Sequence, residues 1–222
     1  MRWGSCVAMG LAGALCSGAM VGAAAATLSV AVTGVDGDPV HDVVVVAEPR
    51  SEERPPLPAR AAAPATVDQR GKEFHPWVSA VYAGTSIIFA NHDDITHHVY
   101  SFSRARQFSF RLQADERRGP LAFPRPGVVV VGCNIHDWMI AYIYVSDSPW
   151  FSRTGKDGRA RIEDLPAGDW RLTIWHPGVV DAAQYARNLT VTADRVMPVQ
   201  IRLRKPLTET GPRPPLDNAG YL

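Results

Sequence analysis

Three residues of one short segment have side chains that can bind a soft metal ion. Cys133, His136 and Met139 are spaced three residues apart and lie between two apolar runs, 128–132 and 140–145. A loop that curls between two strands can bring a thiolate, an imidazole and a thioether onto one ion. Thiolates and thioethers favour copper, and two histidines, one cysteine and a weak axial methionine form the ligand set of a blue-copper electron-transfer site. The segment therefore predicts most of such a site.

The predicted ligand set needs a second histidine from elsewhere in the chain. Residues 91–100 contain His92, His97 and His98. On an extended strand the side chains of His97 and His98 point to opposite faces, so only one of these two can reach a shared ion without a rearrangement of the backbone. The spacing alone leaves the choice open.

The N-terminal residues are typical of a secretory signal peptide. Residues 1–26 carry one positive charge, Arg2, no acidic residue, an apolar stretch and small residues up to Ala26, near which we expect cleavage. An uncleaved membrane anchor is disfavoured because Gly and Ser interrupt the apolar stretch. A lipoprotein is disfavoured because Leu15, before Cys16, is bulky. We therefore expect a periplasmic protein without a membrane span after cleavage.

Cleavage would leave Cys133 as the sole cysteine. A lone exported thiol cannot form an intramolecular disulfide and is open to oxidation unless a bound metal occupies it. One cysteine excludes iron–sulfur clusters, zinc sites built on several cysteines, dinuclear copper–thiolate centres and haem attachment through Cys-x-x-Cys-His. The alternatives are a buried structural cysteine, which explains neither His136 nor Met139, and a hydrolase nucleophile, which gives Met139 no role.

The charge balance argues against nucleic-acid binding. Loss of Arg2 reduces the 23 basic residues to 22, which equals the number of acidic residues. Binding to phosphate backbones needs a basic surface, so we expect no nucleic-acid partner.

The secondary structure is predicted to be almost entirely β. Short segments rich in β-branched and aromatic residues alternate with Gly, Pro, Asp and Asn turns, as in β-sandwiches. Only residues 181–185 suggest a helical turn. The predicted strands are 28–35, 43–47, 77–82, 86–90, 98–103, 107–112, 128–132, 140–145, 160–162, 170–175, 186–192 and 199–203.

Four motifs in order resemble the cupredoxins of the plastocyanin, pseudoazurin and amicyanin type, which are Greek-key β-sandwiches. The motifs are Phe74-His-Pro76, Gly84-Thr-Ser-Ile-Ile-Phe89-Ala-Asn91, Asp93 or Asp94 followed by His97-His98-Val99, and Gly132-Cys133-Asn-Ile-His136-Asp-Trp-Met139. The last two together are similar to the exported cupredoxin-like proteins named methylamine utilization proteins.

The resemblance implies a ligand for each position of a mononuclear type 1 copper site. His97, Cys133 and His136 would be the equatorial ligands and Met139 the axial one. His97 is implied because it takes the first place in the His-x-Val pattern. His98 replaces the usual Asn that ties the two ligand loops together, so it is either a substitute hydrogen-bond donor or a competing ligand.

Other polar and aromatic residues near the motifs have supporting roles in this interpretation. Asn91, Asp93 and Asp94 are the candidates for orienting the histidine rings. Trp138 is expected in the core, with an apolar docking patch beside His136 as the alternative. Histidines next to turn signals, His41 and His176, are expected to be exposed.

A second sandwich is predicted from the two ends of the chain. Residues 148–204, with an Asp157-Gly158 turn and a Leu165-Pro-Ala-Gly168 turn, resemble the later strands of a carboxypeptidase-regulatory-like, transthyretin-type domain. Residues 30–48 are similar to its opening hairpin. The cupredoxin domain would then be inserted into this domain, because insertions are tolerated where chain ends lie close together. The alternative is that the 43–47 strand belongs to the cupredoxin.

These patterns predict the domain boundaries. We expect a signal peptide at 1–26, a split carboxypeptidase-regulatory-like sandwich at 27–50 and 148–204, and a cupredoxin domain at 65–147. A Pro- and Ala-rich linker at 51–64 and a Pro-rich tail at 205–222 complete the chain.

The function expected from the resemblance is single-electron transfer by one bound copper, with a periplasmic redox protein as partner and no substrate turnover. One alternative is a copper-binding module for metal delivery or for assembly of an exported oxidoreductase. The other is a structural β-sandwich without metal.

Overall fold

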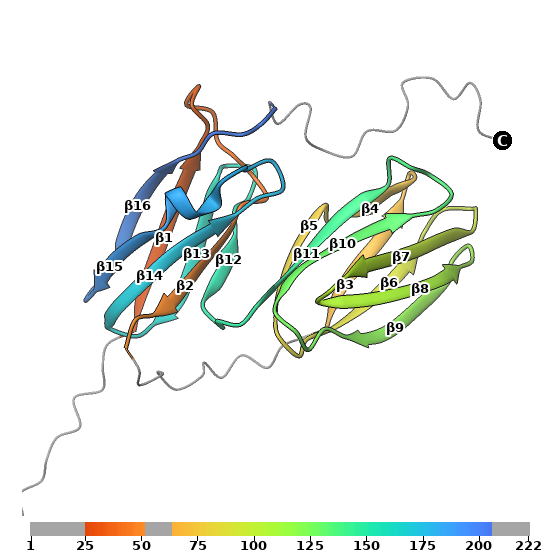
Figure 1. The fold of residues 1–222 in the computed structure, drawn as a ribbon, viewed down its shortest axis with the longest axis horizontal. Helices are drawn as coiled ribbons and strands as arrows, with labels where there is room; N and C mark the ends of the chain where they lie inside the picture. Colours follow the sequence, from red (N-terminus) through yellow and green to blue (C-terminus); the bar gives the residue numbers. More distant parts are fainter. Residues whose placement is uncertain (1–24, 52–63, 206–222) are drawn as a thin grey trace, which may run out of the picture.

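The computed structural model describes residues 25–51 and 64–205, and almost all of their regular structure is β (Figure 1). The strands form four sheets, which make two separate sandwiches. The predicted all-β fold with two sandwiches is therefore confirmed. The single helix of the described residues is the 3₁₀ turn η1 (Ala182–Tyr185), where a helical turn was predicted. No helix in this part of the chain is long and apolar enough to cross a bilayer.

The first sandwich, here called the inserted sandwich, contains β3 to β11. One sheet has five strands in the order β5 (Val78–Tyr82), β11 (Ile140–Ser146), β10 (Gly127–Cys133), β7 (His97–Ser103) and β8 (Arg106–Leu112). The other has four, in the order β4 (Glu73–His75), β3 (Ala65–Arg70), β6 (Ser86–Asn91) and β9 (Arg117–Ala122). Strands β8 and β9 are therefore edge strands.

The second sandwich, here called the split sandwich, joins the two ends of the described chain. One sheet has the order β13 (Arg159–Leu165), β1 (Ala26–Thr33) and β16 (Arg195–Gln200). The other has the order β12 (Phe151–Arg153), β2 (Val44–Pro49), β14 (Gly168–Trp175) and β15 (Arg187–Val191).

The pairing of β2 decides between the two predicted topologies. Its residue Val46 lies opposite both Phe151 of β12 and Thr173 of β14. The strand around residue 45 thus pairs with strands beyond residue 150 and not with β10 or β11. The predicted insertion of one sandwich into the other is confirmed. Apart from their end residues, the predicted signal peptide, linker and tail lie outside the described residues.

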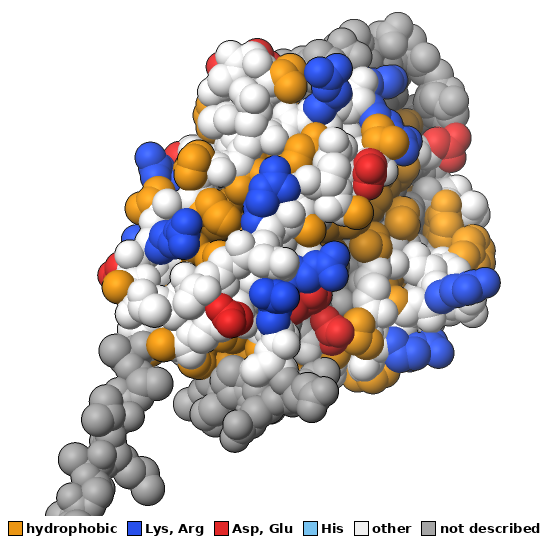
Figure 2. Space-filling model, turned by 60° about the vertical axis from the view of Figure 1, so that its left-hand side comes forward, with side chains coloured by type: hydrophobic (Ala, Val, Ile, Leu, Met, Phe, Trp, Pro, Cys, Tyr) orange, Lys and Arg blue, Asp and Glu red, His pale blue; other side chains and the backbone are white. Residues whose placement is uncertain are grey.

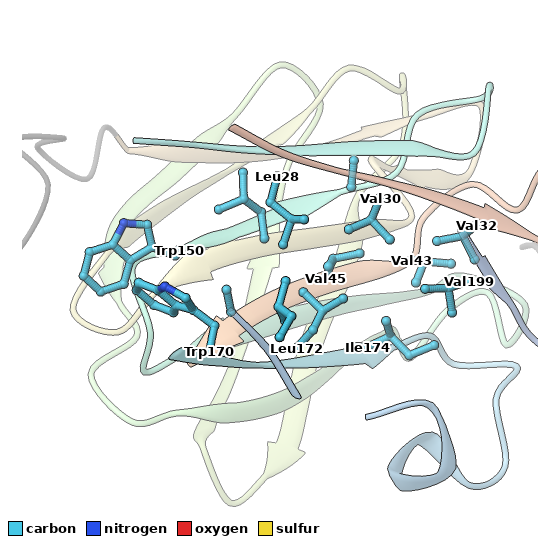
Figure 3. Close-up of a cluster of buried hydrophobic side chains, with 14 of the residues drawn as sticks. Leu28, Val30, Val32, Val43, Val45, Trp150, Trp170, Leu172, Ile174 and Val199 are labelled. Carbon is cyan, nitrogen blue, oxygen red and sulfur yellow. The ribbon is translucent and has the colours of Figure 1, made fainter. Parts of the chain in front are cut away.

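Alternating side chains fill the core of the split sandwich. Strand β1 alternates buried and partly exposed residues along its whole length, as expected for a strand with one face on a core. Leu28, Val30 and Val32 of β1 point toward Val43, Val45, Leu172 and Ile174, and Trp150 lies beside Trp170 at one end (Figure 3). The ring centroids of these two tryptophans are 4.9 Å apart. Aromatic packing thus closes that end of the core.

A third apolar cluster joins the two sandwiches. Val44 and Val46 of β2 are completely or almost completely buried in one cluster with Val78 of β5. Trp175 of β14 packs on Tyr142 and Tyr144 of β11, with ring centroids 5.8 and 5.6 Å apart. Removing apolar surface from water favours this contact. Part of the outer face of the five-stranded sheet is therefore covered by the split sandwich.

The surface carries charges of both signs. Figure 2 brings the split sandwich forward and shows Lys and Arg side chains spread over this face, with Asp and Glu side chains among them. This distribution agrees with the near-balanced composition of 23 basic and 22 acidic residues.

Candidate metal centre

Two neighbouring strands and one loop position the predicted ligands. His97 is the first residue of β7 and Cys133 the last residue of β10, and these strands are paired, with Cys133 opposite Val99. His136 and Met139 lie on the loop between β10 and β11. The amide of Cys133 donates to the Met139 carbonyl at 3.2 Å, and the amide of Met139 donates to the His136 carbonyl at 3.0 Å. The loop therefore curls back on itself, as the spacing predicted.

Three of the four predicted residues converge on one point. His97 Nδ1 lies 3.6 Å from Cys133 Sγ, and His136 Nδ1 lies 3.9 Å from the same sulfur. Among the described residues, this is the one group of three or more His, Cys, Asp or Glu side chains close enough to share an ion, with ligand atoms within 4.8 Å of one another.

The spacing fits two ligands that share a metal ion. Bonds of about 2.3 Å to sulfur and about 2.0 Å to nitrogen, at tetrahedral to trigonal angles, separate the two ligand atoms by about 3.5–3.7 Å. The observed distance of 3.6 Å lies within this range, and that of 3.9 Å lies slightly above it. A thiolate with two imidazoles is also a soft to borderline donor set, which suits copper.

Met139 is held in the same core as the cysteine. Its side chain is completely buried, and it belongs to the hydrophobic cluster that contains Cys133, Val99 and Phe89. Cys133, His97 and His136 are also buried. The four predicted residues thus lie at one end of the core of the inserted sandwich.

The structure separates His97 from His98. His97 is completely buried and faces Cys133, whereas His98 is half-buried and its Nε2 lies 2.8 Å from the Ser109 hydroxyl on β8. The backbone carbonyl of His98 accepts a hydrogen bond from the Asn134 amide at 2.9 Å. The link between the two ligand loops is therefore made here by the backbone of His98, and its ring is turned away from the sulfur.

Asp93 fixes the orientation of His97. Its Oδ2 lies 2.8 Å from His97 Nε2, which leaves Nδ1 free to face the sulfur. The same carboxylate accepts hydrogen bonds from the amides of Gly71 and Lys72 on the β3–β4 turn. Of the two predicted aspartates, it is Asp93 and not Asp94 that makes this contact in the described part of the chain.

Asn91 organises the loop that carries Asp93. Its side-chain amide donates to the carbonyls of Ile95, Leu112 and Gln113, and its Oδ1 accepts from the Asp93 amide at 3.0 Å. These hydrogen bonds of the Asn91 side chain all go to backbone groups and not to a histidine ring. The sequence pattern did not distinguish the residue that contacts a histidine ring, Asp93, from the residue that supports its loop, Asn91.

The electrostatics favour an ionised cysteine. Burial acts to raise the pKa of the Cys133 thiol, but the His97 ring and the backbone N–H groups of Ile135, His98 and His136 outweigh it and lower this pKa below its ordinary value. Burial acts against protonation of His97, yet the Cys133 sulfur and the Asp93 carboxylate together raise its pKa. The pKa of His136 is lowered, first by burial and then by the charges of His97 and Lys72. A thiolate and a neutral His136 are the forms that bind a metal.

Trp138 covers the outer side of His136. The two ring centroids are 5.0 Å apart, and Trp138 Nε1 donates to the Lys72 carbonyl at 3.1 Å. Trp138 is partly buried and packs against the core cluster of the inserted sandwich, as expected. The β3–β4 turn at Gly71 and Lys72 thus braces both histidines, although no motif in the sequence pointed to it.

One expectation about a histidine outside the site was wrong. His176 was expected to be exposed, but its side chain is 1% exposed and packs on Trp77 between the two sandwiches, with ring centroids 5.6 Å apart. A turn does follow His176, as the sequence indicated. This turn of the split sandwich packs against the inserted sandwich, and the histidine ring is buried there.

Of the comparisons of this chain with known proteins, only the comparison with solved structures found similar proteins. No family model and no curated protein matches the chain. The chain is similar to a purple cupredoxin from Nitrosopumilus maritimus, with 20% identity over 37% of this chain and 99% of that one, at a TM-score of 0.33. It is also similar to a Cu-containing nitrite reductase from Thermus scotoductus, with 24% identity over 52% of this chain and 28% of that one, at a TM-score of 0.35.

A third similar structure is a reduced Cu(I) form of an amicyanin variant. The identity is 17% over 45% of this chain and 98% of that one, at a TM-score of 0.35. The likeness to methylamine utilization proteins and to carboxypeptidase-regulatory-like domains remains a prediction.

Proposed function

We propose that this chain is an exported type 1 copper protein that carries single electrons between redox partners and turns over no substrate. The observation that carries the proposal is the buried convergence of His97 Nδ1 and His136 Nδ1 on Cys133 Sγ, at 3.6 and 3.9 Å. In the proposed site these three residues and Met139 would hold the copper ion. When bound, copper would supply the one-electron couple. The periplasmic location and cleavage near Ala26 belong to the same proposal.

The scaffold supports this role because it fixes the ligands before any metal binds. His97 and Cys133 lie on strands that are paired to each other and, on their other sides, to β8 and β11. Asp93 holds the far side of the His97 ring, and Trp138 lies against the His136 ring. Ligands held in this way change little when the charge of the site changes, which suits electron transfer.

Burial of the ligands favours a carrier over a delivery protein. His97, Cys133 and His136 are 0, 3 and 6% exposed. A recipient protein would have to reach these side chains to take over the ion, and the folded sandwich gives it little access. The site also gives no support to a hydrolase nucleophile. Cys133 is buried and lies between a strand and a loop, whereas nucleophilic cysteines typically lie at the N-terminus of a helix.

The test is copper loading of the purified protein, with two matched histidine variants. The wild type should give an intense blue absorption and a narrow copper hyperfine splitting in the oxidised state. His97→Ala should lose both signals, whereas His98→Ala should keep them, because only His97 faces the sulfur. Cys133→Ser should also remove the blue absorption, since this absorption arises from the thiolate ligand.

Voltammetry completes the test. A reversible one-electron wave supports the carrier function. A wild-type protein that stays colourless after loading, or a Cys133→Ser protein that keeps the blue colour, would show the proposal to be wrong.

A further inference from the structure

The outer face of the five-stranded sheet carries exposed apolar side chains. We define the outer-sheet patch as Tyr100 and Phe102 of β7, Val130 of β10 and Ile140 at the start of β11. Phe102 is 78% exposed, Val130 43% and Ile140 37%. The rings of Tyr100 and Phe102 are 5.2 Å apart. A large exposed aromatic side chain among other apolar ones is typical of an interaction surface.

The strand register gathers these residues in one place. Tyr100 lies opposite Gly132, and Gly132 lies opposite Ile140 on the far side of β10. The pairing of β7 with β10 ends at Tyr100, but the Val130 amide donates to the hydroxyl of Ser103, the residue after Phe102, at 2.9 Å. The four side chains therefore form one continuous area and are not scattered.

The patch continues directly into an interface that the fold already uses. Val130 lies opposite Tyr142, whose ring packs on Trp77 and on Trp175 of the split sandwich. The half of this sheet face formed by β5 and β11 is thus covered, while the half formed by β7 and β10 is open. The open half presents apolar and aromatic side chains of the same kind as the covered half.

The open half lies next to the proposed copper ligand. A Cβ atom on Gly132 would lie 2.9 Å from Cζ and 3.0 Å from the hydroxyl of Tyr100, so the ring rests on the backbone at Gly132. Gly132 immediately precedes Cys133. A protein seated on the patch would therefore be one aromatic ring and one peptide unit away from the thiolate.

The edge of the patch is basic. Arg104 follows Phe102 and is exposed in the turn before β8, and Arg111, opposite His98 on β8, is also exposed. Neither of these two arginines forms an ion pair with another residue of the described chain. Residues 97–112, which form β7, β8 and the turn between them, contain no Asp or Glu.

We propose that the outer-sheet patch docks an electron-transfer protein whose apolar contact area is bordered by carboxylates. The inference rests on the proposed function, for which it supplies the partner's surface chemistry. Apolar contact provides the affinity at the centre of the patch, and Arg111 of β8 and Arg104 of the turn before it attract and orient the acidic partner.

The experiment is a binding titration that does not depend on copper colour. Full-length mature protein, both copper-loaded and copper-free, is titrated with a small acidic c-type cytochrome at low ionic strength, and a basic c-type cytochrome of similar size is the charge control. We expect saturable binding of the acidic cytochrome only, lost at high salt because the charges are screened.

A double variant and a matched control locate the surface. Phe102→Thr with Val130→Thr keeps good strand formers at exposed positions and should weaken binding of the acidic cytochrome about tenfold or more, the loss typical of central interface residues. Val196→Thr, at a position of β16 in the split sandwich that is 66% exposed, should leave the affinity unchanged.

Each contrary outcome overturns the inference. Equal affinity for the basic cytochrome, unchanged binding by the double variant, or equal weakening by Val196→Thr would each do so. Sedimentation that shows a dimer lost in the double variant would mean that a second copy of the chain occupies the patch. A copper-loaded protein that binds the acidic cytochrome but shows no blue absorption would contradict the proposed function and leave the docking surface in place.

Discussion

The two sandwiches bury similar apolar cores but use their buried polar groups differently. In the split sandwich the buried hydroxyls of Ser148 and Thr154 bond to backbone groups, at Ala47 and at Val40 and Val43, and so hold the strands together. In the inserted sandwich, by contrast, the buried rings of His97 and His136 face the sulfur of Cys133. Alternating apolar strands build both cores, and the placement of a few polar side chains makes only one of them a candidate metal centre.

The buried histidines show the difference most clearly. His97 has a polar neighbour on each side, the Asp93 carboxylate and the Cys133 sulfur, and its pKa is raised. His176 has one: its Nδ1 accepts a hydrogen bond from the Gly178 amide at 3.0 Å, and its buried Nε2 has no partner in the described structure. Burial lowers its pKa to about 4, although the charge of Asp42 acts in the opposite direction. The first ring thus lies between two polar partners, and the other is packed as a neutral group.

Truncation of the split core should have the largest effect on stability and should spare the metal site. Trp170 is 1% exposed and packs on Trp150. Trp170→Ala should cost about 3–5 kcal/mol of unfolding free energy, through lost burial and the cavity left behind. Denaturant unfolding checks the value, and copper content at low denaturant should stay at the wild-type level. Loss of copper from the folded variant would mean that the two sandwiches are not separable in this way.

The neutral packing of His176 should make the interface sensitive to acid. Its folded pKa of about 4 lies below the ordinary value of 6.5, so the unfolded chain binds the additional proton between these values. Unfolding free energy should therefore fall as pH decreases from about 6.5 to 4, by at most about 3 kcal/mol from this residue. The contribution is fully present above pH 6.5.

A variant isolates this contribution. His176→Leu should lose some stability at every pH, because the Gly178 amide loses its acceptor, but the extra decrease between pH 6.5 and 4 should disappear. Denaturant unfolding at several pH values measures the slope. A slope equal to that of the wild type would show that other groups account for the acid sensitivity.

Strands with strong local patterns could be predicted, and strands that depend on their neighbours could not. The apolar runs at β1, β2, β10, β11 and β14 predicted the elements, and the resemblance of residues 30–48 and 148–204 to parts of one domain predicted the split topology. Strands β3, β4, β9 and β12 were missed. Strand β9 contains Gly119 and Pro120 and only one large apolar residue, Leu121, and Pro is tolerated there because β9 is an edge strand. Its extended state comes from pairing with β6, which no local pattern records.

The same distinction applies to the site. Loop spacing predicted that Cys133 and His136 converge, because both ligands lie on one short segment. The choice of His97 came from family resemblance, and the register of β7 against β10 explains it physically. The contacts of Asp93 with Gly71 and Lys72 join segments that are distant in the sequence, as does the contact of Tyr100 with Gly132. The burial of His176 depends on how the two sandwiches pack against each other.

The role of Asp93 can be tested against its neighbour. Asp93→Asn removes the charge that orients His97, and loss of such a partner typically lowers metal affinity about 10- to 100-fold. Asp94→Asn is the matched control and should have no effect, because Asp94 is exposed and does not contact His97. Competition with a Cu(I) chelator measures both affinities. Equal losses in the two variants would show that net charge near the site matters and that the orientation of His97 does not.

Replacement of the proposed axial ligand should have the smallest effect on binding, and it compares the two sandwiches directly. Met139 is completely buried beside the site, whereas Met197 is a partly buried residue of β16 in the split sandwich. Leu has nearly the volume of Met, so neither substitution should cost more than about 1.5 kcal/mol of stability. Met139→Leu should keep its copper but shift the reduction potential, since a weak axial ligand tunes the couple more than it holds the ion. Met197→Leu should leave the potential unchanged. Voltammetry of both variants decides the point, and loss of all copper from Met139→Leu would make this methionine a ligand that anchors the ion.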